Sequence, residues 1–206
     1  MIVELLYKKK LEEYYSHERK ENVFYVTDLT RCPLKVKFEQ EYRELALSEI
    51  FTPAGILGDL VHRGIQSSLN IEGYEAEVEV EKEKGLEIEG KSYIIKGRAD
   101  IVLKSKTNNE TLIIEIKTAR RDDGLPQKHH ILQLRLYLWL FEVNKGILLY
   151  VTPDRITEYI IEGALDTASV MRLVEENIRL APAPRYIWEC SYCIFAKLCP
   201  NKASNR

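Results

Sequence analysis

KGRADIVL at residues 96–103 and LIIEIK at residues 112–117 are the two stretches of this chain that decide its fold. Each places one acid, Asp100 or Glu115, within a run of apolar residues typical of a buried strand. Between them, TNNE at residues 107–110 is typical of a turn. The pattern therefore predicts two antiparallel strands joined by a hairpin, each with an acid in its interior.

The position of this turn also predicts the register of the hairpin. An even-numbered loop centred between residues 107 and 108 places Asp100 opposite Glu115, or diagonal to it, on one side of the sheet. Direct partners of this kind have Cβ atoms about 4.5–5.5 Å apart. Lys117 lies two residues beyond Glu115 and shares its face, because side chains alternate along a strand.

The two acids suggest a metal site. Carboxylates forced together in apolar surroundings repel each other and are costly to bury unpaired. A divalent cation such as Mg²⁺ or Mn²⁺ resolves the conflict, since it prefers oxygen ligands. The alternative is that Asp100 and Glu115 are ordinary sheet-surface charges paired with Lys117 and Arg98.

The sequence on either side of this hairpin predicts a mixed α/β fold. Five glutamates alternate with apolar residues from Glu75 to Glu83, which predicts a half-buried strand with one acidic face and completes an antiparallel meander. Thr27 and Asp28 are candidate N-caps for a helix near Pro33. We expect a mixed central sheet flanked by helices, with helices over 2–16, from 53 and over 127–142 and 166–180, and strands over 146–152 and 157–161.

Three polar residues interrupt otherwise apolar helical patterns. His62 follows Gly58 by four residues, and Gln133 and Tyr137 are spaced so that they share one face of the 127–142 helix. Such groups need partners inside a protein. For His62 alone, a hydrogen-bonded core histidine is the simpler interpretation.

The four cysteines of the chain are Cys32, Cys190, Cys193 and Cys199. If they share one centre, all thiols are used and the two ends of the domain must meet. Four thiolates suit either tetrahedral Zn²⁺ or an iron–sulfur cluster, and the residue types leave both open. The Cys199–Pro200 ending favours iron and sulfur mildly, and four unlinked buried thiols are the remaining alternative.

Four motifs, in this order and spacing, resemble the RecB-like branch of the PD-(D/E)xK nuclease superfamily: Gly58-x3-His62, GRAD at 97–100, EIK at 115–117 and Gln133-x3-Tyr137. With the flanking cysteines, the chain is similar to the CRISPR-associated RecB-like exonucleases over residues 32–199. The resemblance implies a restriction-endonuclease-like core at 51–180, an N-terminal helical segment at 1–50 that contributes Cys32, and a C-terminal tail at 181–206. The cysteines of the tail and Cys32 would form an iron–sulfur cap that joins the termini.

The resemblance also implies residue roles. His62, Asp100, Glu115 and the backbone carbonyl of Ile116 would hold Mn²⁺ or Mg²⁺. Lys117 would be the catalytic lysine, and two residues of the 127–142 helix, Gln133 and Tyr137, would position DNA or the attacking water. The cysteines Cys32, Cys190, Cys193 and Cys199 would bind a [4Fe–4S] cluster, with [2Fe–2S] or Zn²⁺ as alternatives.

By the same resemblance, the expected function is metal-dependent cleavage of single-stranded DNA from 5′ ends, which prepares fragments for the CRISPR integrase and its partner subunit. Two other readings stay open: a non-catalytic DNA-binding subunit of the integrase complex, and a RecB-like repair nuclease outside CRISPR. The chain contains no Walker-type glycine-rich loop, so an unwinding motor would have to be a separate protein.

Composition adds limits on partners. In 206 residues, 30 Lys and Arg against 32 Asp and Glu give a net charge of −2, so DNA binding must rest on local patches. Candidates are Arg120, Arg121, the segment 128–130 and Arg135, with a basic face of Arg31, Lys35, Lys37 and Arg43 on the approach and with Tyr42, Tyr186 and Trp188 as stacking residues. No apolar run is long enough to cross a bilayer, so a cytoplasmic protein without membrane contact is expected, and a homo-oligomer is left open.

Overall fold

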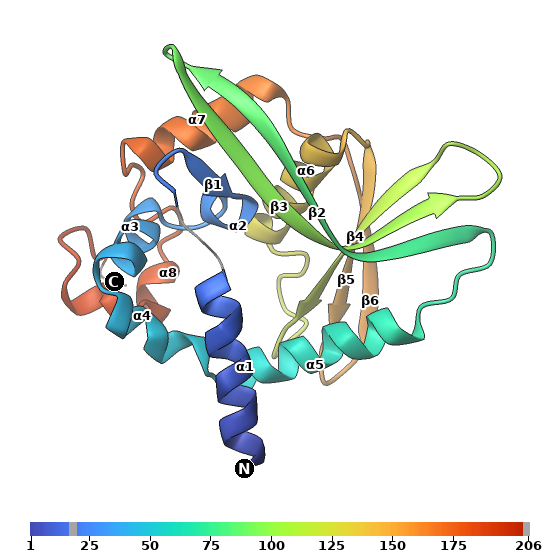
Figure 1. Ribbon diagram of the computed structural model, residues 1–206, viewed down its shortest axis with the longest axis horizontal. Helices are drawn as coiled ribbons and strands as arrows, with labels where there is room; N and C mark the ends of the chain where they lie inside the picture. Colours follow the sequence, from blue (N-terminus) through green and yellow to red (C-terminus); the bar gives the residue numbers. More distant parts are fainter. Residues whose placement is uncertain (17–19, 204–206) are drawn as a thin grey trace.

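The protein is built around a central sheet of six strands (Figure 1). The structure is a computed structural model and describes residues 1–16 and 20–203. The strands lie in the order β1-β3-β4-β5-β6, and β2 pairs with β3 beside that path. β1–β3 and β4–β5 are parallel, and the other pairs are antiparallel, so the sheet is mixed as expected. Their bounds are β1 Val23–Tyr25, β2 Tyr74–Ile88, β3 Lys91–Ser105, β4 Thr111–Thr118, β5 Lys145–Val151 and β6 Ile156–Glu162.

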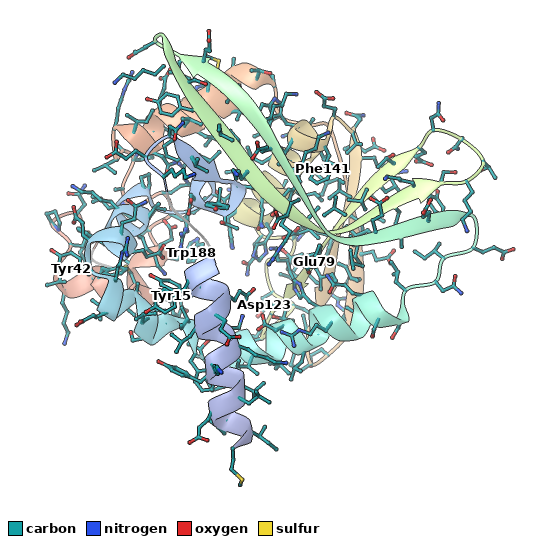
Figure 2. The ribbon with its side chains drawn as sticks, in the orientation of Figure 1. Tyr15, Tyr42, Glu79, Asp123, Phe141 and Trp188 are labelled. Atoms are coloured by element: carbon teal, nitrogen blue, oxygen red, sulfur yellow. The ribbon has the colours of Figure 1, made fainter. Side chains whose placement is uncertain are left out.

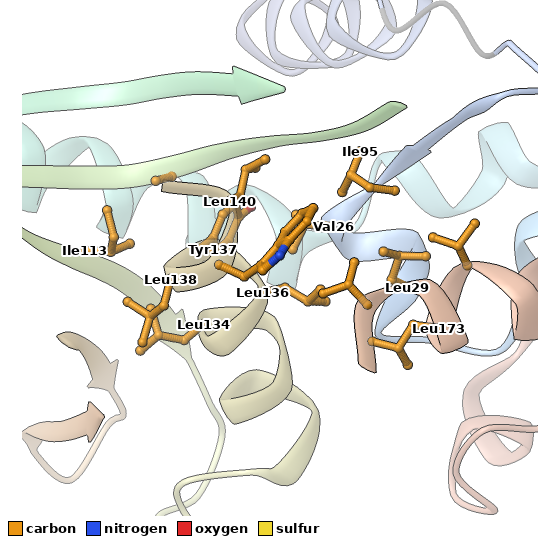
Figure 3. Packing of buried hydrophobic residues seen from close by; sticks show 14 of the residues in the cluster. Val26, Leu29, Ile95, Ile113, Leu134, Leu136, Tyr137, Leu138, Leu140 and Leu173 are labelled. Atoms are coloured by element: carbon orange, nitrogen blue, oxygen red, sulfur yellow. The ribbon is translucent and has the colours of Figure 1, made fainter. Parts of the chain in front are cut away.

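Helices cover both faces of the sheet. α6 (Lys128–Phe141) packs on one face, where its leucines join β3, β4 and β5 in the main core (Figure 3). α5 (Pro53–Ser68) runs along the other face and packs on a second cluster formed by β3 and β4. Thr52 caps α5, since its side chain accepts a hydrogen bond from the Gly55 N–H at 3.1 Å.

The long hairpin of β2 and β3 turns sharply in its middle, so that one half covers α6 and α7 (Thr167–Ile178) and the other half extends toward β4 (Figure 1). The burial pattern of β3 records this bend. Ile95 and Ala99 face the α6 core, whereas Ile101 and Leu103 face the α5 cluster. Odd-numbered residues therefore change face between 99 and 101, and Asp100 stands at the change.

A segment from the N-terminal part of the chain packs against the C-terminal segment beside the sheet. The N-terminal part contributes α2 (Val26–Leu29), α3 (Pro33–Glu41) and α4 (Arg43–Ile50), and α1 (Ile2–Ser16) projects away from them (Figure 1). The C-terminal part contributes α8 (Glu189–Tyr192) and the 3₁₀ helix η1 (Ile194–Lys197). Phe38, Ala46 and Phe195 form a small core between the two parts. The segment that contains Cys32 thus lies against the C-terminal segment, as a shared centre for the four cysteines requires.

The antiparallel meander β2-β3-β4 is confirmed, but two local expectations are wrong and one strand was not predicted. The short strand β1 has no alternating pattern long enough to identify it. Thr27 and Asp28 lie inside α2, and the N-cap of α3 is Cys32, which directly precedes Pro33 at the first helical position. β2 is not half-buried along its first part, because Val78 is 47% exposed where the hairpin leaves the core.

Among the described residues, no helix combines the length and apolar character that crossing a bilayer requires.

Gly97 on β3 provides a test of the packing between β3 and α6. A Cβ at this position would lie 2.7 Å from Tyr137 Cε1, 2.8 Å from Val26 Cγ2 and 2.9 Å from Leu140 Cδ2. We expect Gly97→Ala to lower the free energy of unfolding by about 1–3 kcal/mol through overpacking, as measured by urea denaturation. Gly85→Ala is the matched control on β2, because a Cβ there meets nothing within 4 Å. Equal stability of the two variants would contradict this packing.

Candidate active site

The site forms where β3 and β4 separate. Their register runs from Lys104 opposite Thr111 to Ile101 opposite Ile114, which is the register expected from the turn, and it ends there. Asp100 is the next residue of β3, and its Oδ2 accepts a hydrogen bond from the Ile116 N–H at 2.7 Å. The Asp100 carboxylate thus accepts a hydrogen bond from a backbone N–H at the point where the two strands separate.

The other edge of β3 is also interrupted at Asp100. Val78 and Val80 of β2 pair with the neighbours of Asp100, but Glu79 between them has a φ of +52° and no partner in the register. Gln66 of α5 reaches this gap: its Nε2 donates to the Asp100 carbonyl oxygen at 3.1 Å and to Glu79 Oε1 at 2.6 Å. Sequence reasoning missed Gln66, although its position four residues after His62 places both on one face of α5.

Glu115, Lys117 and Gln133 form a closed hydrogen-bonded triangle. The Lys117 ammonium donates to Glu115 Oε1 at 2.7 Å and to Gln133 Oε1 at 2.9 Å. The Gln133 amide donates to Glu115 Oε1 at 2.9 Å. Gln133 is therefore oriented by its two neighbours, and in turn it fixes the position of the Lys117 ammonium.

Glu115 is an unusual carboxylate because it is 3% exposed. Burial raises its pKa to about 7, with the nearby Asp100 charge adding to the increase and Lys117 opposing it. Its Oε2 is buried without a hydrogen-bond partner. An unpaired buried oxygen costs free energy, so this atom is a position where a cation would be favourable.

His62 of α5 reaches Asp100 from the opposite side of the fork, with its Nδ1 3.4 Å from Asp100 Oδ1. Burial alone would lower the pKa of His62, but the Asp100 and Glu115 carboxylates outweigh it and raise the pKa. His62 is thus a neighbour of the acids and not an isolated core histidine.

Tyr137 lies one helical turn beyond Gln133 and is 4% exposed. Burial, with the Glu115 charge, raises its pKa well above the usual value, so the phenol stays protonated. Gln133 and the Arg98 backbone lie near its hydroxyl and oppose part of this increase. Tyr137 therefore connects α6 to the bend of β3 beside Asp100.

The residues gathered here fit a divalent cation by donor type: two buried carboxylates, one with an unpaired oxygen, and an imidazole. As the side chains stand, no three His, Cys, Asp or Glu groups in the described ranges 1–16 and 20–203 form a ready metal cluster. The physical reason is that Lys117 contacts Glu115 while Asp100 contacts the Ile116 N–H. The ordinary-surface alternative does not hold for Asp100, since Arg98 pairs with Glu79 and Glu13 instead.

The cysteines form a second candidate site. Cys32, Cys190, Cys193 and Cys199 line one small cavity between α3 and the C-terminal segment, and all are free thiols. Burial raises the pKa of Cys32 and of Cys193. Four sulfurs around one cavity fit a tetrahedral metal or an iron–sulfur cluster by donor type.

Most of the basic residues expected on the approach to the site already form ion pairs with acids of the same chain. Arg31 pairs with Asp28 and Glu39, Lys35 with Glu49, and Lys37 with Glu41. The expected basic face on α3 is therefore wrong, because acids on the same segment neutralise it. Exposed cations without a described ion pair are found instead in the segment that follows β4: Arg120, Arg121 and Lys128.

Two substitutions at Asp100 separate the hydrogen bond that its side chain accepts from the Ile116 N–H from the effect of its charge. In Asp100→Asn the side-chain oxygen still accepts from the Ile116 N–H, whereas Asp100→Ala leaves this buried donor unpaired. We expect Asp100→Ala to be about 1–3 kcal/mol less stable than Asp100→Asn in denaturant unfolding without added metal. Both variants lack the charge, so equal stabilities would show that the hydrogen bond in the fork does not support the fold.

Comparisons with known proteins agree with this geometry. Residues 67–200 match the family model of the PD-(D/E)XK nuclease superfamily. The CRISPR-associated exonuclease Cas4 of Saccharolobus solfataricus is 52% identical over 202 residues, which cover 98% of this chain and 99% of the relative. The crystal structure of SSO0001 superposes with a TM-score of 0.94 at 52% identity and covers 99% of this chain and 98% of that one.

The crystal structure of an alkaline exonuclease from Laribacter hongkongensis is 14% identical to this chain and superposes with a TM-score of 0.47. The superposition covers 86% of this chain and 95% of that one. The family match spans the strands that carry both acids and the helix that carries Gln133 and Tyr137. The chain therefore belongs to the PD-(D/E)XK nuclease superfamily, within the family of CRISPR-associated RecB-like exonucleases.

Proposed function

We propose that this protein is a metal-dependent exonuclease that hydrolyses single-stranded DNA from 5′ ends. The single observation that carries the proposal is the placement of Asp100 and Glu115 at the fork of β3 and β4, with Glu115 Oε2 buried and unpaired and the Lys117 ammonium on Glu115 Oε1. A module that only binds DNA has no physical need to bury acids near a polyanion.

His62, Asp100, Glu115 and the Ile116 carbonyl would hold Mn²⁺ or Mg²⁺. When bound, the cation supplies Lewis-acid stabilisation of the charge that develops on phosphate. The role of the chain is to hold these groups in place before substrate arrives. The Ile116 N–H orients Asp100, and Gln66 fixes the Asp100 backbone through its carbonyl oxygen.

Lys117 is the group that would act on the reacting atoms. Its ammonium is held by Glu115 and Gln133 and stays a donor with a free direction, since an ammonium has three N–H groups. It can therefore donate to an anionic phosphate oxygen or hold the attacking water. A donor placed in advance where charge develops stabilises the transition state more than the ground state.

Gln133 and Tyr137 would position Lys117 and the DNA. Gln133 orients Lys117 directly, and the buried Tyr137 lies one helical turn beyond Gln133 on the same face of α6. The relative at 52% identity is named a CRISPR-associated exonuclease, which supports exonuclease activity in a CRISPR context. We propose DNA as the substrate and the preparation of fragments for integration as the role. The integrase and its partner subunit would then be the partners.

The four cysteines would bind a [4Fe–4S] cluster whose role is to join the two ends of the chain. Cys32 comes from the N-terminal segment and the other three from the tail, so one cluster would cross-link segments about 160 residues apart. Support comes from the common cavity and from the small core of Phe38, Ala46 and Phe195 beside it.

The nuclease assignment predicts a specific loss. Lys117→Met should lower kcat for end-labelled single-stranded DNA by about 10²–10³-fold in Mn²⁺ or Mg²⁺, because one preorganised donor is removed. Lys104→Met is the matched control, since Lys104 lies on the neighbouring strand β3 and pairs with Glu77 outside the site. Chelator should abolish cleavage, and products should shorten from the 5′ end only. Undiminished cleavage by Lys117→Met would remove the assignment.

The cluster assignment predicts a coloured protein. The purified chain should be brown with a visible absorption that bleaches on reduction, and Cys193→Ser should lose this absorption and melt at lower temperature. Ser191→Ala, two residues away, should keep both. A colourless protein with one equivalent of zinc would contradict the iron–sulfur assignment and leave the four-thiol site intact.

A further inference from the structure

We propose that an aromatic groove beside the active site stacks the unpaired bases of single-stranded DNA. The groove encloses about 950 Å³ and is lined by residues 124 and 127–129, which lead into α6, and by residues 185–188 and 192 of the C-terminal segment. The inference rests on the proposed function, because it gives the groove the same substrate as the site.

The wall of the groove is a set of aromatic rings that are already arranged for stacking. Tyr186 and Trp188 are parallel within 15° with ring centroids 5.8 Å apart, and the His129 ring lies 5.0 Å from Trp188. Burial, aided by the Lys117 charge, lowers the pKa of His129 to about 4, so the imidazole is neutral at pH 7. These rings meet across the groove from two segments far apart in the sequence.

Part of this aromatic surface is exposed. Trp188 is 47% exposed, and the neighbouring Tyr192 is 80% exposed. A large exposed indole on a groove wall is a stacking surface that every base can use, since each base has a π-face. In duplex DNA these base faces are covered by neighbouring bases, so the groove suits a single strand.

The charge of the groove fits a polyanion. Its described lining contains two cations, Lys128 and Arg185, and no carboxylate, in a chain whose net charge is −2. Lys128 is exposed and has no ion pair among the described residues. Arg185 is bound to Glu176 through Nη1 at 2.7 Å, but its Nη2 is buried without a partner. Lys128 and Arg185 thus give the lining of the groove a positive charge.

α6 connects the groove to the active site. His129, Gln133 and Tyr137 are spaced by four residues and lie on one face of the helix, so the groove begins about 6 Å along the helix axis from Gln133. That distance is comparable to the separation of neighbouring phosphates in an extended single strand. A strand bound at Lys117 would therefore extend along α6 toward His129 and the groove.

The position of the wall is fixed by Glu189. One of its carboxylate oxygens accepts from the Cys32 N–H and the other from the Tyr186 N–H, both at 2.7 Å. The stacked rings are thereby tied to the N-terminal segment and to the cavity of the four cysteines. The groove is preformed, which lowers the entropic cost of binding a flexible strand.

The test measures the affinity for a dye-labelled oligothymidylate by fluorescence anisotropy in the Asp100→Asn background without added metal. Adding Trp188→Ala should weaken binding of the single strand by about 5- to 100-fold, the range for loss of one stacked base, and leave the affinity for duplex DNA nearly unchanged. Tyr15→Ala is the control, because Tyr15 is an exposed aromatic residue (66%) that does not line the groove. Figure 2 labels both rings.

A second measurement reads the stacking directly. The chain has two tryptophans, so Trp139→Phe leaves Trp188 as the sole indole, and its fluorescence should be quenched by the oligonucleotide. In the otherwise unaltered enzyme, Trp188→Ala should raise KM for single-stranded DNA and leave kcat within about twofold.

Two results would overturn the proposal: unchanged single-strand affinity in Trp188→Ala, or absence of quenching. If the affinity is unchanged and the sedimentation coefficient is altered, a second copy of the chain covers the groove instead. If the unaltered protein cleaves no DNA, the proposed function fails, whereas the affinity comparison still decides the groove.

Discussion

The arrangement of this protein depends on one hydrogen bond, from the Ile116 N–H to Asp100 Oδ2 at 2.7 Å. It forms where the ladder between β3 and β4 ends, so a carboxylate replaces the backbone acceptor that a continuing strand would provide. The bond closes the fork at its base, beside Glu115, which contacts α6 through Gln133. α5 contributes His62 and Gln66 from the other side, and the hairpin β2–β3 is free to bend away toward α7 (Figure 1).

The local consequence is a chain of restrained polar groups in apolar surroundings. Asp100 is held by the backbone, and Gln133 and Lys117 hold each other and Glu115. Each group is buried or nearly so, and the leucines of α6 fill the space around them (Figure 3). Glu115 Oε2 is the atom that this network leaves without a partner. The proposed cation would bind next to this oxygen.

Sequence reasoning could predict the acids but not the bend. The turn at 107–110 determines the register, because a short even-numbered loop leaves few pairings, and the observed pairing of Ile101 with Ile114 agrees with it. The change of face at Asp100 could not be predicted, since alternation is continuous through KGRADIVL and the bend depends on Glu79 and Gln66 elsewhere. β1 was missed because three residues carry too little periodicity. Neutralisation of the basic face on α3 depends on pairs such as Arg31–Glu39 that need the folded helix.

The central claim is that Asp100 and Glu115 share a divalent cation. Crystals grown with Mn²⁺ and measured at the manganese absorption edge test it most directly. The account predicts one anomalous peak between the Asp100 and Glu115 carboxylates, within about 2.5 Å of an oxygen of each, with the Lys117 ammonium moved away from Glu115. A peak bound by only one of the two acids, or no peak while Lys117 stays on Glu115, would contradict it.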